Sequence, residues 1–206
     1  MELVIKIIYK KFIERKMKFI KTELTGVFII EPKVFFDDRG YFFESYNEKV
    51  FNEAGVTNKF VQDNQSKSSY GTIRGLHFQK GEFAQAKLVR VLQGNVLDVA
   101  VDIRLDSPTF SQHVSVELSD ENNRQLFIPR GFAHGFAVLS ETAIFSYKCD
   151  NFYDKEFEGS ILFNDKDLGI DWNVDLNKAI LSEKDLNNQS FQNYCSNPAF
   201  IYDGDK

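Results

Sequence analysis

The sequence predicts one all-β domain, a sandwich or barrel, and three observations indicate it. In residues 87–104, KLVRVLQGNVLDVAVDIR, apolar and polar residues alternate on both sides of Gly94-Asn95, which predicts two strands joined as a β-hairpin. The chain also contains 21 phenylalanines, a residue favoured on half-buried sheet faces. Beyond the N-terminus, clear helical candidates are confined to residues 46–55 and 181–188.

The remaining elements follow the same pattern along the chain. Residues 113–118, HVSVEL, and 143–149, AIFSYKC, alternate as short strands do. The first helical candidate, YNEKVFNEAG, ends in Gly55, a residue common just after the last helical turn. The C-terminal segment is polar and less regular, and the sequence shows no internal repeat. A length of 206 residues then favours a single domain.

The first 16 residues differ in character from the rest of the chain. Lysines and arginines stand among apolar residues that recur at roughly helical spacing. Lys6 interrupts the apolar run and no small-residue cleavage site follows, which argues against a signal peptide. A helix lying on a membrane surface is one alternative. We favour an extension outside the domain, with Met17 as the natural first residue and residues 17–206 as the domain.

Composition excludes several classes of partner. The net charge is −5, and the sequence shows no long basic stripe beyond the N-terminus, so we expect no nucleic-acid partner. No apolar run has the length needed to span a bilayer, so we expect no membrane partner. The two cysteines, Cys149 and Cys195, form neither a metal-type pair nor a disulfide framework. A reducing cytoplasm is the location that fits them.

The three histidines indicate different environments. His113 lies in an alternating strand beside polar residues and is expected to be solvated. His134, in IPRGFAHGF, follows a proline–glycine turn whose spacing resembles the second motif of the cupin superfamily, a double-stranded β-helix or jelly roll. Metal-binding cupins carry a His-x-His pair and a glutamate on an earlier motif, where this chain has only His77. A metal site is therefore not expected. On spacing alone, His77 is equally readable as a hydrogen-bonded core histidine.

Six motifs in order resemble one family. They are EPKVFFDDRGYFFESYN, FVQDNQSKSS, IRGLHFQKGEFAQAKLVRVLQGNVLDVAVDIR, SPTF, RQLFIPRGFAHGFAVLS and LSEKD. Together they are similar to the dTDP-4-dehydrorhamnose 3,5-epimerases, over residues 17–185. The resemblance implies a metal-free cupin-type jelly roll with a few short peripheral helices, typically a homodimer. It also implies epimerisation of dTDP-4-keto-6-deoxy-D-glucose at C3 and C5, in dTDP-L-rhamnose biosynthesis, without a cofactor.

The same resemblance assigns catalytic roles. His77, in the RGLH motif, would be the base, Asp185 would orient it, and Tyr147 would be the acid. The residue types suit this chemistry, because inversion needs a base on one face of the sugar and an acid on the other, and histidine exchanges protons readily near neutral pH. Lys87 is the candidate partner of the enolate oxygen. Each residue also has a structural interpretation: Asp185 as a helix cap and Tyr147 as strand packing.

Further motif positions match contacts to the nucleotide sugar. Diphosphates favour arginine and lysine, and thymine favours an aromatic platform, which is the role implied for Tyr153. The other implied substrate contacts are Arg39, Glu44, Gln62, Asp63, Asn64, Arg74, Lys87, His134, Glu158 and Lys184.

Two positions depart from the family pattern. Gln65 stands where DNHSKS motifs have histidine, and Arg130 stands where IPEGFAHGF motifs have glutamate. Neither touches the three catalytic positions. Two other functions remain open from the sequence: a single-site epimerase or keto-isomerase acting on a related dTDP-4-keto-6-deoxy sugar, and a non-catalytic jelly roll that binds nucleotide sugars.

Overall fold

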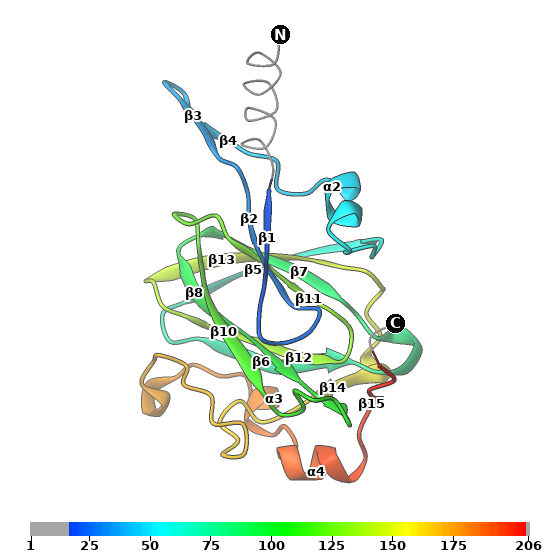
Figure 1. Ribbon diagram of the computed structural model, residues 1–206. Helices are drawn as coiled ribbons and strands as arrows, with labels where there is room; N and C mark the ends of the chain where they lie inside the picture. The colour runs from blue at the N-terminus through cyan, green and yellow to red at the C-terminus, as the bar shows by residue number, and fades with distance from the viewer. Residues whose placement is uncertain (1–16, 205–206) are drawn as a thin grey trace.

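The computed structural model describes residues 17–204, which form two antiparallel sheets packed face to face (Figure 1). The six-stranded sheet has the order β1 (Lys18–Lys21), β2 (Phe28–Glu31), β11 (Gln125–Ile128), β7 (Lys87–Gln93), β13 (Thr142–Cys149) and β5 (Gln62–Ser69). The five-stranded sheet has the order β10 (His113–Ser119), β8 (Asn95–Asp102), β12 (Phe132–Val138), β6 (Ile73–Gln79) and β14 (Glu158–Ser160). This arrangement confirms the prediction of an all-β jelly roll.

Smaller elements lie around the two sheets. A two-stranded hairpin, β3 (Phe35–Asp37) and β4 (Gly40–Phe42), projects away from the sandwich (Figure 1). Near the C-terminus, β15 (Phe200–Ile201) pairs in parallel with β9 (Arg104–Leu105). The helical pieces are α2 (Glu48–Glu53), α3 (Glu183–Leu186), α4 (Phe191–Ser196) and the 3₁₀ turns η1 (Gly81–Phe83), η2 (Lys155–Phe157) and η3 (Leu176–Lys178).

The main core fills the space between the sheets. Its side chains are less than a tenth exposed and come from both layers, among them Val89, Leu126 and Phe145 from one sheet and Val96, Leu118 and Phe136 from the other. Burial of this apolar surface supplies the driving force that holds the layers together. One end of the same inter-sheet space contains polar side chains instead.

The C-terminal segment covers the outer face of the five-stranded sheet. Phe163, Trp172 and Tyr194 pack there against Leu97 and Val99 of β8. Because β8 is covered on both faces, its sequence is almost continuously apolar instead of alternating. This cover also carries α3 to the edge of the sheet formed by β6 and β14.

The predicted hairpin around Gly94 is wrong, although both strands exist. β7 pairs with β11 and β13 of the six-stranded sheet, whereas β8 pairs with β10 and β12 of the other. Gly94, at φ 82°, therefore turns the chain from one sheet to the opposite one. A tight turn between two apolar strands leaves the same local pattern in a hairpin and in a crossing between layers, so the sequence alone did not separate them.

The other predicted elements are confirmed in place. Residues 113–118 lie in β10 and residues 143–149 in β13, while 46–55 contains α2, followed by Gly55 at φ 91°. The second helical candidate is a single turn, α3. His113 is half-buried and not fully solvated, since the C-terminal cover approaches it.

The predicted N-terminal extension, residues 1–16, lies outside the described residues. Within residues 17–204, each helix is too short or too polar to cross a bilayer.

Gly94→Ala should lower stability more than Gly169→Ala does. Both glycines have a positive φ, 82° and 58°, so both substitutions strain the backbone. Only at Gly94 would the new Cβ lie within van der Waals overlap, 2.1 Å from the Thr142 carbonyl oxygen. We expect Gly94→Ala to lose about 2 kcal/mol more than the control. Urea unfolding at one protein concentration measures this, and equal midpoints for the two variants would contradict it.

Candidate active site

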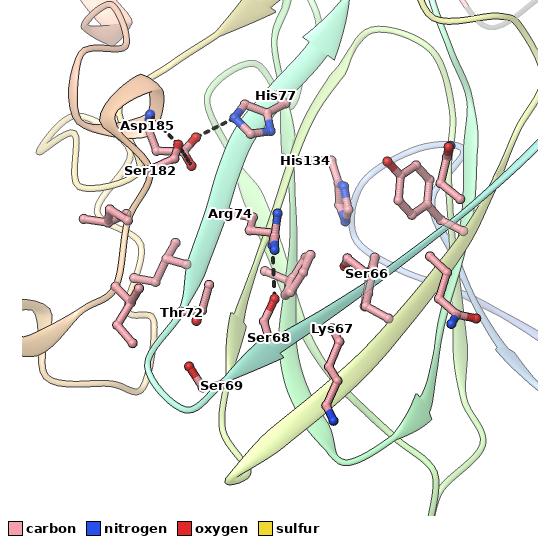
Figure 2. A pocket seen from close by; sticks show the side chains of 18 of the residues that line it. Ser66, Lys67, Ser68, Ser69, Thr72, Arg74, His77, His134, Ser182 and Asp185 are labelled. Carbon is pink, nitrogen blue, oxygen red and sulfur yellow. Dashed lines mark hydrogen bonds and ion pairs between the residues drawn. The ribbon is translucent and has the colours of Figure 1, made fainter.

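A polar cavity of about 660 Å³ opens between the two sheets (Figure 2). β5, β7 and β13 line one side, β6 and β12 line the other, and the segment that ends in α3 closes the edge. A second cavity of about 250 Å³ adjoins it and extends toward Tyr153 and Glu158. Four side chains line both cavities: Asn64, His77, Lys87 and Tyr147.

An extra residue in β6 places Arg74 and His77 on the same side of the strand. His134 of β12 pairs with His77, but Phe136, two residues later, pairs with Arg74, three residues earlier. Residues three apart on a regular strand face opposite sides, and this bulge reverses that relation. Gly75 makes it possible: its φ is 139°, and a Cβ there would lie 2.5 Å from the Cα of Gly135. Gly75, the glycine of the RGLH motif, is therefore required by the backbone conformation of the bulge.

His77 forms a short hydrogen bond with Asp185 across 108 residues of sequence. Its Nε2 lies 2.5 Å from Asp185 Oδ1, and the aspartate side chain is only 4% exposed. Burial alone would raise the pKa of Asp185, but hydrogen bonds from His77 and Ser182 outweigh it and hold the pKa below the ordinary value. An ionised carboxylate accepts the Nε2 proton, so Nδ1 remains free to take a proton from another molecule.

Tyr147 approaches the cavity from the opposite sheet. It belongs to β13, and its ring packs against the main core while its side chain lines both cavities. Burial raises the pKa of the Tyr147 phenol, which keeps the hydroxyl protonated at neutral pH. His77 and Tyr147 therefore present a proton acceptor and a proton donor from two different walls of one cavity.

Lys87 projects from β7, on the same wall of the cavity as Tyr147. Its ammonium sits 5.9 Å from the centroid of the Tyr147 ring. Burial lowers the pKa of Lys87, and a cation that has lost part of its hydration acts more strongly on a nearby developing charge. The lysine is placed to stabilise a negative oxygen held between His77 and Tyr147.

A second histidine–aspartate pair lies deeper in the cavity. His134 Nε2 is 3.0 Å and 3.1 Å from the two carboxylate oxygens of Asp98, and both residues are buried. Burial lowers the pKa of His134 despite the neighbouring carboxylate, so the ring is neutral and donates through Nε2. Sequence analysis read residues 87–104 as alternating strands and did not single out Asp98. The signal that was missed is a carboxylate in the middle of an otherwise apolar run, VLDVAV.

The smaller cavity has a charged and aromatic end. Tyr153 Oη donates to Glu158 Oε2 at 3.0 Å, and Lys184 forms an ion pair with Glu158 Oε1. These bonds lower the pKa of Glu158 against the effect of its partial burial. The Tyr153 backbone N–H donates to Gln62 Oε1 at 3.2 Å, and the tyrosine ring is half exposed. An exposed ring held at a cavity mouth is suited to stacking on a planar base.

The structure brings most of the sequence-predicted residues to the walls of these two cavities. Lys184 lines neither cavity and is connected to the smaller one through its ion pair with Glu158, and three further residues lie elsewhere. Asp63 points to the outer face of β5, between the inward-facing Gln62 and Asn64, and forms an ion pair with Lys148 at 2.9 Å. Arg39 lies at the turn of the β3–β4 hairpin with Asp37, and Glu44 follows the hairpin and accepts from Asn47 at 3.0 Å. Asp63 faces outward because side chains alternate between the two faces of a strand. Arg39 and Glu44 lie away from the cavities because the hairpin projects from the sandwich.

Residues 17–204 contain no cluster of three His, Cys, Asp or Glu side chains able to hold a metal ion. The expectation that the site works without a metal ion remains a prediction.

Comparison with known proteins identifies the family. A family model described as dTDP-4-dehydrorhamnose 3,5-epimerase matches residues 21–193. The dTDP-4-dehydrorhamnose 3,5-epimerase of Shigella flexneri is 57% identical over 176 residues, 85% of this chain and 96% of that protein. A crystal structure of the enzyme of the same name from Elizabethkingia anophelis NUHP1 has 62% identity and a TM-score of 0.83, covering 86% of this chain and 97% of the other.

A third relative carries a ligand. The dTDP-6-deoxy-D-glucose-3,5-epimerase of Legionella pneumophila Philadelphia 1, in complex with dTDP-4-keto-L-rhamnose, has 48% identity and a TM-score of 0.88. It covers 92% of this chain and 100% of its own. The jelly-roll fold and these relatives place the chain in the class of cupin-type epimerases that act on dTDP-sugars. The chain belongs to the dTDP-4-dehydrorhamnose 3,5-epimerase family, which confirms the family resemblance inferred from the sequence motifs.

Asp185→Asn should keep the shape of the site and remove the charge that holds His77. We expect kcat to fall about 10²- to 10⁴-fold, since the base loses the partner that sets its tautomer and stabilises its protonated form. Binding of dTDP should change little. Asp175→Asn is the matched control, because Asp175 is exposed and pairs only with nearby groups such as Lys178. Steady-state kinetics and calorimetric titration with dTDP measure both effects, and near-normal turnover of Asp185→Asn would refute the role.

Proposed function

We propose that this chain epimerises dTDP-4-keto-6-deoxy-D-glucose at C3 and C5, with His77 as the base and Tyr147 as the acid. The observation that carries the proposal is the placement of these two groups on opposite sheets, facing one cavity. Inversion at carbon requires a proton to leave one face of the sugar and another to arrive on the opposite face. A base and an acid on a single wall would return the original configuration.

The first step is removal of a proton from carbon. The C4 ketone acidifies the hydrogens on both neighbouring carbons, C3 and C5. His77 Nδ1 takes the proton, the C–H electron pair moves into the carbon–carbon bond, and the carbonyl oxygen becomes an enolate. Asp185 stabilises the imidazolium through its 2.5 Å contact, and the Lys87 ammonium stabilises the enolate oxygen.

The second step returns a proton to the opposite face. Tyr147 donates its phenolic proton to the carbon as the ketone re-forms. Burial raises the pKa of this phenol, so the donor form is present at neutral pH. Because C3 and C5 flank the same ketone, one base, one acid and one oxyanion partner serve both centres in turn, once His77 has released its proton to water and Tyr147 has regained a proton from water between the two rounds.

The smaller cavity accounts for the nucleotide end of the substrate. Tyr153 stacks on thymine, and the cations Lys184 and Arg74 face the diphosphate. Support comes from the geometry, because the cavity with Tyr153 and Glu158 adjoins the catalytic one at His77 and Lys87. It also comes from the Legionella relative, whose bound ligand is a dTDP-linked keto sugar.

We further propose that the domain spans residues 17–206, acts in the cytoplasm and has no nucleic-acid partner. The two free thiols, Cys149 and Cys195, support a reducing compartment. The net charge of −5 supports the absence of a nucleic-acid partner.

A homodimer would bring the β3–β4 hairpin to the partner's active site. The hairpin projects from the sandwich and exposes four aromatic side chains, Phe35, Phe36, Tyr41 and Phe42, with Phe36 and Phe42 at least 70% exposed. Aromatic side chains exposed together in this way favour contact with another protein surface. A second copy is the occupant that also explains why Arg39 and Glu44, matched to substrate contacts, lie away from the cavity of their own chain.

Incubation with the substrate in heavy water tests the reaction. Deuterium at both C3 and C5 is expected, with no exchange in His77→Ala. Deuterium at one carbon would indicate a single-site epimerase, and none in the wild-type protein would indicate a non-catalytic binder. Near-normal turnover of purified His77→Ala would overturn the assignment of the base.

Tyr147→Phe should separate the two proton transfers. The substitution removes one hydroxyl and keeps the ring, so packing against Phe145 is retained. Product formation should fall about 10²- to 10⁴-fold, while His77 continues to exchange solvent deuterium into recovered substrate. Mass spectrometry of substrate and product gives both rates. Equal loss of exchange and turnover, or loss of neither, would exclude Tyr147 as the acid.

Mixing two impaired variants tests the shared site. If Arg39 reaches the partner's cavity, a heterodimer of His77→Ala and Arg39→Ala contains one site with both residues intact. Random subunit exchange at equal concentrations should then restore about a quarter of wild-type activity, since half the dimers are mixed and each has one complete site. Mixing His77→Ala with Asp185→Asn is the control and restores activity only if His77 and Asp185 come from different chains. Absence of recovery in the Arg39 mixture, with exchange verified by mass spectrometry, would refute the shared site.

A further inference from the structure

We propose that Ser182 is a positioning residue for catalysis, the third member of a chain of hydrogen bonds from Ser182 through Asp185 to His77. The inference rests on the proposed function, because it assigns a role in orienting the base of that reaction. Figure 2 shows the three side chains in line at the edge of the cavity, with Asp185 between the other two.

Two side-chain donors hold the Asp185 carboxylate, one on each oxygen, and the backbone N–H of Gly75 also acts on this carboxylate. Ser182 Oγ donates to Asp185 Oδ2 at 2.7 Å, while Oδ1 contacts His77 Nε2 at 2.5 Å. A carboxylate held on one oxygen can still rotate about its last torsion. Held on both, it has one orientation, and that orientation directs Oδ1 at the imidazole. Because the carboxylate is buried, loss of the Ser182 bond would also leave an oxygen without this partner.

Ser182 is also the N-cap of α3. The cap uses the oxygen of its hydroxyl as an acceptor, and the positioning role uses the hydrogen as a donor. As a cap, Oγ accepts the backbone N–H of Asp185 at 3.1 Å. As a positioning residue, it donates its hydrogen to the Asp185 carboxylate. In a capping box, an acidic side chain at this place reaches back to the backbone N–H of the cap residue. Here the carboxylate contacts the hydroxyl and the imidazole instead, which a helix start alone does not require.

The segment that carries Ser182 is held in place by other bonds. Ile180 exchanges backbone hydrogen bonds with β6 and its preceding turn, donating to Gly71 at 2.9 Å and accepting from Ile73 at 3.0 Å. Beyond α3, the Leu162 N–H donates to the Gln189 carbonyl at 2.9 Å. Removal of the Ser182 hydroxyl should therefore change the orientation of Asp185 and not the path of the chain.

Three substitutions at this position separate the donor from the cap. Ser182→Ala removes both roles. Ser182→Gly also removes the donor, but glycine is a much better cap than alanine. Ser182→Thr keeps a hydroxyl for both. We expect alanine and glycine to lower kcat about 10- to 100-fold, as loss of an outer hydrogen-bond partner does at other sites, and threonine to restore most of it.

Other readouts exclude a general loss of structure. KM and dTDP affinity should stay within about twofold, because Ser182 acts on the proton transfer rather than on nucleotide binding. Deuterium wash-in should fall in proportion to kcat, since the base is the group affected. Ser190→Ala is the matched control: Ser190 caps α4, with its Oγ accepting from Asn193 N–H at 3.2 Å, and lies outside the cavity. It should lower the urea midpoint and leave kcat unchanged.

A crystal structure of Ser182→Ala gives a readout that does not depend on activity. The expected result is a rotated Asp185 carboxylate and a lengthened or broken contact with His77. Recovery of kcat in Ser182→Gly, unchanged kcat in Ser182→Ala, or an unmoved Asp185 would overturn the positioning role. Failure of the proposed function is recognised separately, as absence of deuterium exchange at C3 and C5 in the wild-type protein.

Discussion

The hydrogen bond between His77 and Asp185 is the contact on which the site depends. A histidine on a strand has two ring nitrogens, and only a fixed acceptor on one makes the other a directed base. The acceptor comes from a segment 108 residues later in the chain, which must first cross and cover the five-stranded sheet. The apolar contacts of Trp172 and Tyr194 lie on the outer face of that sheet, and they bring α3 to the edge where His77, the proposed base, lies.

The proposed reaction has a second requirement, that the base and the acid belong to different layers. The main core keeps the two sheets at a fixed separation, and the cavity is the part of the same space where polar side chains replace apolar ones. His77 comes from the five-stranded sheet, and Lys87 and Tyr147 come from the six-stranded sheet. The distance across the sugar is thus set by sheet packing, which is more rigid than any loop.

Sequence patterns predicted what depends on local alternation and on motifs, and missed what depends on partners distant in the chain. The strands β7, β8, β10 and β13 and the α2 helix were found from alternation and spacing, and the candidates His77, Tyr147 and Asp185 from motifs. The crossing at Gly94 was read as a hairpin, because a turn does not record which sheet receives the next strand. Asp98 was not recognised, because it shares with Val96 and Ala100 the face of β8 that packs between the two sheets, while the more apolar face is covered by the C-terminal segment. Asp63 was predicted to contact the substrate together with Gln62 and Asn64, although the alternation of side chains along β5 turns it outward.

One turn of helix joins the two ends of the site. Lys184 of α3 forms an ion pair with Glu158, which also accepts the Tyr153 hydroxyl, and the next residue along the helix is Asp185. The contacts expected to hold the nucleotide and the contact that orients the base are therefore adjacent in sequence and attached to the same short element. Binding energy from the non-reacting part of a substrate raises kcat only where it is transmitted to the reacting groups. In this fold, α3 connects the groups proposed to bind the nucleotide with the carboxylate that orients His77, the proposed base. The position of His77 therefore depends on the groups that receive the nucleotide.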